Sequence, residues 1–169
     1  MATWKTGANS PLGLPLPGNV DTTAVVKVGT IAKFYDETQG ECEFIYLPGV
    51  ASTVPGDAVI YDLLPGSETT ARLTTTNGAG KGRAVAFATA ATVAGTFGWY
   101  QIRGVAVINV AAAYAIGLLY TTATAGVLDD AVVALASILG AGGSSAIGTP
   151  AANQAYATIL YPRTQGTVA

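Results

Sequence analysis

The chain has 169 residues, of which 50 % are apolar, 8 % aromatic and 11 % charged, with a net charge of −2. It is long enough to bury a core, too apolar to be disordered, and lacks the basic surplus that nucleic-acid binding requires. It has no histidine and a single cysteine, Cys42. This excludes Ser-His and Cys-His nucleophile pairs, histidine metal sites and an internal disulfide.

Charged residues are distributed unevenly along the chain. Only Asp129, Asp130 and Arg163 fall within residues 104–169, and all the others lie between Lys5 and Arg103. A free monomer that exposes so little charge tends to associate. We therefore predict that the C-terminal part is covered by protein or by lipid.

Residues 1–21 are predicted to form an extended arm. Their three prolines, together with glycine and asparagine, disfavour a helix or a central strand. The arm is nevertheless too apolar for a solvated tail, so it packs either on a neighbouring molecule or over its own core. The remaining residues, 22–169, form the main domain, with a candidate sub-boundary in the Gly-rich stretch 77–82.

Short runs of alternating apolar and polar residues, separated by turn signals, follow the arm. This pattern is typical of β strands. The expected strands are 25–34 and 41–47 as a hairpin, then 58–64, 69–76, 82–90, 96–110 and 155–161, the last ending at Pro162. The fold class predicted is mainly β, a small β-sandwich or β-barrel-like domain of short antiparallel strands with an extended N-terminal arm.

Two segments remain ambiguous between helix and strand. Residues 111–119 and 129–139 are alanine-rich, and the second begins with two acids that suit a helix N-terminus or a turn before a strand. In the strand 96–110, one face is expected to be apolar and the other polar. The apolar face comprises Tyr100, Ile102, Ala106, Ile108 and Val110.

The sequence shows no enzyme signature. The stretch 77–83 contains a lysine among glycines but lacks the spacing of a phosphate-binding loop. The pairs Glu41/Glu43 and Asp129/Asp130 are interpreted as solvated or interface charge, and Cys42 as a buried, inert thiol. We predict no catalytic residue, no cofactor, no metal and no small-molecule substrate.

The uncharged stretch 104–128 is long enough to span a membrane as a helix. Its apolarity comes largely from alanine, Asn109 lies within it, and its flanks lack a basic side. Membrane insertion is therefore not expected, and protein is the expected cover.

Several blocks of the sequence resemble a known family. Residues 29–36, 40–62, 83–110, 118–130 and 155–163, above all GWYQIRGVA (98–106) and LYTTATAGVLDD (119–130), are similar to the capsid decoration (cement, head-stabilising) proteins of tailed bacteriophages. The resemblance spans residues 25–163. It implies a β-rich homotrimer on the outer surface of the virion head, made in the host cytoplasm, which stabilises the head by bridging subunits of the major capsid protein.

This resemblance suggests two sets of contact residues. The residues expected in a capsid-contacting arm are Trp4, Leu12, Leu14, Leu16 and Pro17. The residues expected at the trimer interface are Tyr100, Ile102, Val105, Val107 and Tyr120. For both sets the alternative is packing within the chain. The alternative function is the base of a head fibre or a carbohydrate-binding virion module, in which aromatic side chains would be exposed.

Overall fold

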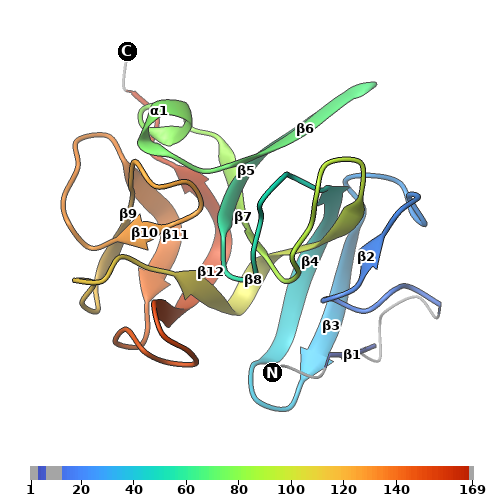
Figure 1. Cartoon of the computed structure of the whole chain (residues 1–169), viewed down its shortest axis with the longest axis horizontal. Coiled ribbons are helices and arrows are strands. Elements are labelled where there is room, and N and C mark those ends of the chain that lie inside the picture. Colours follow the sequence, from blue (N-terminus) through green and yellow to red (C-terminus); the bar gives the residue numbers. More distant parts are fainter. Residues whose placement is uncertain (1–3, 7–12, 168–169) are drawn as a thin grey trace.

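Antiparallel strands build almost the whole molecule (Figure 1). The computed structural model describes residues 4–6 and 13–167, which contain twelve strands and one helical turn. The strands are β1 (Lys5–Thr6), β2 (Val20–Asp21), β3 (Ile31–Asp36), β4 (Gly40–Pro48), β5 (Ala58–Leu64), β6 (Ser67–Arg72), β7 (Ala84–Ala88), β8 (Phe97–Asn109), β9 (Leu118–Thr121), β10 (Leu128–Asp129), β11 (Ser137–Gly143) and β12 (Gln154–Thr164), and the helical turn is α1 (Thr75–Gly78). The prediction of a mainly β, sandwich-like domain is confirmed.

The long strand β8 joins the two ends of the molecule. Its first half pairs with β4, and its second half pairs with β12 from Arg103 opposite Leu160 to Asn109 opposite Gln154. The strands follow the order β1-β3-β4-β8-β7-β12-β11-β9-β10, with β2 on β8 and with β5 between β6 and β7. In Figure 1, β3 and β4 stand at one end, β9 to β11 lie at the other, and the β5–β6 hairpin projects from the body.

The buried side chains form three clusters. An aromatic cluster under β3 and β4 contains Phe34, Phe44 and Trp99 in edge-to-face contact, with ring centroids 5.3 to 5.5 Å apart. A second cluster lies between β4, β5, β7 and β8, and a larger aliphatic one extends to β11 and β12. The apolar face of 96–110 is buried along its whole length, which settles which face of this strand belongs to the core.

Two predicted strands end earlier or start later than expected. The first begins only at Ile31, because Gly29 adopts a left-handed φ of +86° that interrupts extended backbone. The run 69–76 leaves the sheet after Arg72, because Thr74 caps α1. The Thr74 hydroxyl accepts from the Asn77 amide (3.3 Å), and the Asn77 side chain accepts from the Thr74 amide (2.8 Å).

Neither ambiguous segment is helical. Residues 111–117 form turns before β9, and residues 129–139 contain the end of β10 and the start of β11. The last strand also passes Pro162 and ends at Thr164, so the predicted stop is wrong. A bulge in the β11–β12 pairing lies on β12, because Gly140 alone separates Leu139 from Ala141 while residues 160–162 separate their partners, so Pro162 falls where the ladder has no need of an N–H.

Cys42 lies fully buried in the aromatic cluster, as predicted. Burial raises the pKa of its thiol to about 11. At pH 8 we expect only about one thiol in a thousand to be ionised, so a thiolate-specific disulfide reagent should leave the native protein unlabelled and label it fully in denaturant. Rapid labelling of the native protein at pH 8 would contradict this burial.

Candidate functional site: an uncharged sheet face

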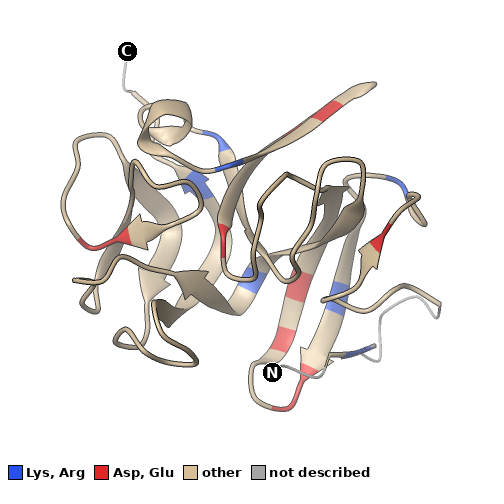
Figure 2. Ribbon diagram, viewed as in Figure 1, with Lys and Arg blue, Asp and Glu red and all other residues tan. Residues whose placement is uncertain are grey.

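The second half of β8 and the strands beside it present an outward face with little charge, which Arg103, opposite Leu160, and Asp129, opposite Tyr120, border. This neutral face consists of Val105 and Val107 on β8, Tyr156, Thr158 and Leu160 on β12, and Leu118 and Tyr120 on β9. One row crosses four strands, because Val105 pairs with Thr158, Thr158 with Gly142 of β11, and Gly142 with Leu118. Figure 2 shows charge on β3, β4 and nearby loops, with little on β9 and β11.

Large apolar side chains protrude from this end of the molecule. Leu118 is 66 % exposed and Leu160 is 58 % exposed, and both belong to the neutral face. Two further residues of the adjoining loops, Ile116 and Val132, are exposed to 60 % and 81 %. Scattered apolar residues are normal on a soluble protein, but exposed apolar residues grouped on a face with so little charge indicate an interaction surface.

Three of the five predicted trimer residues lie on the neutral face, namely Val105, Val107 and Tyr120, and each is half-buried. The other two, Tyr100 and Ile102, point from the opposite side of β8 and are 0 % and 1 % exposed within this chain. The Tyr100 hydroxyl also hydrogen-bonds to Thr92 Oγ1 (2.7 Å). Packing within the chain therefore accounts for Tyr100 and Ile102.

The described part of the arm lies over its own domain. Trp4 is buried in the aromatic cluster, with its ring 4.9 Å from that of Phe44, and Leu14 packs on the same cluster. The indole of Trp99 donates to the Pro15 carbonyl (2.8 Å), and Pro17 is buried. Leu16 is 36 % exposed, so it retains surface for an outside contact, and Leu12 lies outside the described residues.

Sequence reasoning passed over Tyr156, Leu118 and Leu160. The alternation in 155–161 was visible, and it places Tyr156, Thr158 and Leu160 on one face and the small Ala155 and Ala157 on the other. Side-chain size alone would assign Tyr156 and Leu160, rather than the two alanines, to the core. The structure shows the reverse, because the two alanines are fully buried in the large aliphatic cluster.

A polar cluster borders the neutral face where β4, β8 and β12 meet. Glu43 of β4 accepts from Arg103 Nη1 (2.7 Å) and from the Tyr161 hydroxyl, and Lys33 Nζ lies 3.6 Å away. Glu43 is only 6 % exposed, so the expectation of a solvated carboxylate is wrong for this residue. Burial opposes ionisation, but the hydrogen bonds from Tyr161 and Arg103 outweigh it and hold the pKa of Glu43 below its usual value.

The lowered pKa of Glu43 predicts a pH-dependent contribution to stability. The contribution is fully present above the unfolded-state pKa of about 4.3 and is lost as the pH falls through the lower folded-state pKa. The stability difference between the wild type and Glu43→Gln, from urea unfolding at pH 6, 4 and 3, should therefore shrink toward low pH. Glu41→Gln, a half-exposed neighbour on the same strand, is the control and should change stability little at any pH. A constant Glu43→Gln difference would contradict the assignment.

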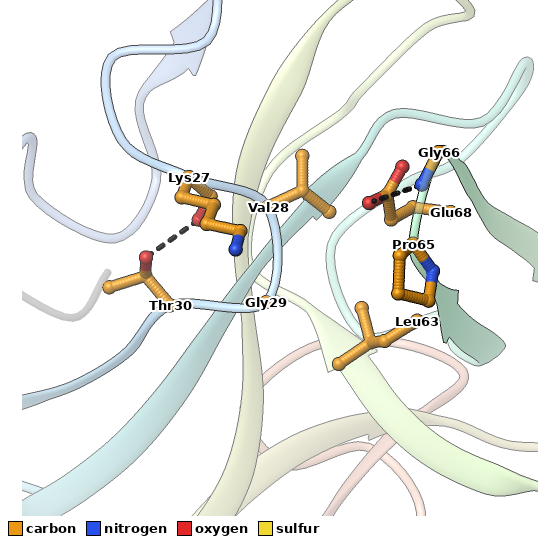
Figure 3. Close-up of a pocket in the computed structure, with 8 residues that line it drawn as sticks. All are labelled: Lys27, Val28, Gly29, Thr30, Leu63, Pro65, Gly66 and Glu68. Atoms are coloured by element: carbon orange, nitrogen blue, oxygen red, sulfur yellow. Dashed lines mark hydrogen bonds between the residues drawn. The ribbon is translucent and has the colours of Figure 1, made fainter.

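A shallow hollow of about 520 Å³ lies under the projecting hairpin (Figure 3). Residues 27–30 form one side, and Leu63, Pro65, Gly66 and Glu68 of the hairpin form the other. The Glu68 carboxylate accepts from the Gly66 amide (3.3 Å), and the Thr30 hydroxyl donates to the Lys27 carbonyl (2.6 Å). These bonds fix the two loops themselves, and no set of polar groups converges on the hollow.

The described residues, 4–6 and 13–167, hold no group of three or more cysteine or acidic side chains placed to bind a metal ion. In the same residues, no helix has the length and apolarity to cross a bilayer. No protein-family model matches the chain, and neither a curated protein nor a solved structure matches it.

Proposed function

We propose that this protein is a structural virion protein, a decoration or cement protein that binds the outer surface of an assembled phage head. In this proposal it acts as a homotrimer that bridges subunits of the major capsid protein. The observation that supports it best is the neutral face, where Leu118 and Leu160 protrude from a surface with little charge. Such a face is suited to burial against protein.

The proposed stabilisation needs no catalytic group. A ligand that binds only the assembled shell stabilises that state by mass action. A trimer that contacts three shell subunits at once also raises the effective concentration of each contact, so three modest interfaces give tight attachment. The carbohydrate-binding alternative gains no support from the tryptophans, since Trp4 and Trp99 are 8 % and 1 % exposed and offer no face for stacking on a sugar.

Light scattering after size exclusion in detergent-free buffer tests the trimer. The wild type is expected at three times the mass of the chain, and Leu118→Asp, which places a charge on the neutral face, is expected as a folded monomer. Leu64→Asp is the matched control, because Leu64 is equally exposed (63 %) but lies on the projecting hairpin, so this variant should remain trimeric. If the Leu118→Asp protein stays trimeric, the neutral face is not part of the trimer interface.

Pelleting with assembled shells that lack their decoration protein tests the function itself. The wild type should co-sediment with shells and raise their thermal stability, and it should not bind the unassembled capsid subunit. Equal binding to shells and to free subunits, or no binding to either, would overturn the proposal.

A further inference from the structure

One edge of β8 is left without a partner strand. Within the described part of the chain, β12 is the only strand that pairs with residues 104–109 of β8, whereas β4 pairs no further than Arg103. The direction of the backbone groups follows from their hydrogen bonds. Tyr156, which stands opposite Val107, donates its N–H to Ser145 Oγ (2.8 Å), and its carbonyl accepts from the Ser144 amide (2.7 Å).

Both polar groups of Tyr156 therefore face away from β8, and Val107 and Tyr156 form a non-hydrogen-bonded pair. The N–H and C=O of Val107 consequently point to the open edge. The groups on either side of Val107 along this edge are occupied. The Asn109 amide donates to the Gly56 carbonyl (2.9 Å), and the Val105 carbonyl accepts from the Gln101 side chain (2.9 Å). Val107 is thus an open position between two occupied backbone groups, the Val105 carbonyl and the Asn109 amide.

Val107 lines a hollow of about 770 Å³. We call it the β8 groove, and its walls include Trp4, Pro17, Gln39, Pro55, Val107 and Tyr156. No charged side chain lines it. Its wall also contains a buried acceptor, Gln39 Oε1, for which the described residues provide no hydrogen-bond donor. Because that oxygen is buried, the polar backbone groups that the groove presents are the N–H and C=O of Val107.

We infer that the β8 groove binds an extended, uncharged segment of a partner polypeptide, which adds as a short strand to the open edge at Val107. An extended peptide supplies the alternating N–H and C=O groups that an open strand edge requires. A charged side chain would lose its hydration in a groove that offers no counter-ion. Small and apolar side chains fit the proline- and aromatic-lined walls. The groove shares Val107 and Tyr156 with the neutral face, but the inference rests on the open backbone edge and not on shell binding.

Panning a random heptapeptide library against the immobilised full-length protein tests the inference. Enriched peptides should be free of charge at their central positions, and amide exchange measured by NMR should show Val107 protected when such a peptide is added. Val107→Pro removes the N–H and should weaken binding about tenfold, the effect of one to two net hydrogen bonds. Val107→Thr keeps both the amide and the branched shape, so it should bind like the wild type.

Two results would overturn the inference: no peptide is enriched, or the enriched peptides bind Val107→Pro as tightly as Val107→Thr. If Val107→Pro does not fold, the hydrogen exchange rate of the Val107 amide in the wild type, measured with and without the peptide, tests the inference instead. Protection by the peptide supports strand addition, and unchanged exchange rejects it.

Discussion

Replacement of Asp57 by alanine is expected to lower the free energy of unfolding by about 3 to 5 kcal/mol, because it removes a buried carboxylate and leaves the partly buried Arg72 and two further donors without their acceptor. Asp57 is 1 % exposed at the start of β5. Its carboxylate accepts from Arg72 Nε (2.8 Å), from the Val54 amide (3.0 Å) and from Asn109 Nδ2 (2.9 Å). The substitution therefore breaks a junction of β5, β6 and β8 in one step.

The same junction extends to the loop before β10. Arg72 also donates to the Ala125 carbonyl (2.7 Å), and a Cβ on Gly126, whose φ is +80°, would lie 2.5 Å from the Asp57 carboxyl carbon. Loss of Asp57 thus releases Arg72 and this loop as well. Urea unfolding at pH 7 measures the effect.

Asp62→Ala is the matched control for Asp57→Ala. Asp62 lies on the same strand and faces Arg83 at 3.5 Å, but both side chains are nearly half exposed, so the expected loss is at most about 1 kcal/mol. Equal losses in the two variants would show that burial of the Asp57 network contributes nothing. A loss of less than 1 kcal/mol for Asp57→Ala would contradict the role of the junction directly.

The fold class could be predicted because it depends on local signals. Alternation of apolar and polar residues identifies strands whatever their partners, and it grouped Ile102, Ala106 and Ile108 on one face of β8, but it did not show that this face is the buried one. The failures at Gly29 and Thr74 are also local. The left-handed backbone of Gly29 delays the start of β3, although the side chains before it alternate as in a strand. Thr74 caps α1, so β6 ends although the alternation continues beyond it.

The candidate site depends on register, which local patterns do not specify. Glu43 lies on a strand whose neighbours alternate in the ordinary way, and only its pairing with Arg103, sixty residues along the chain, explains its burial. The open edge at Val107 has the same origin, because it exists where β4 diverges from β8. A sequence can suggest that a strand is apolar, but the absence of a partner on one edge is a property of the assembled sheet.

Gly104→Ala is expected to lower the free energy of unfolding by at least about 2 kcal/mol, for two separate reasons. Gly104 adopts a φ of +104° in the middle of β8, which an L side chain adopts only under strain. A Cβ there would also lie 2.5 Å from Cys42 Sγ and 3.3 Å from Cys42 Cα, so the strand could not keep its approach to β4. Thermal and urea unfolding measure the loss.

The double variant Cys42→Ala/Gly104→Ala separates these reasons. It removes the sulfur contact but leaves the strained φ and the close approach to the Cys42 backbone, so it should recover part of the loss relative to Cys42→Ala alone. Gly117→Ala is the control, since no atom lies within 4 Å of its Cβ position, and its effect should stay within about 0.5 kcal/mol. A Gly104→Ala protein as stable as Gly117→Ala would mean that β8 can shift away from β4 without cost. The register that opens the edge at Val107 would then not be fixed by this contact.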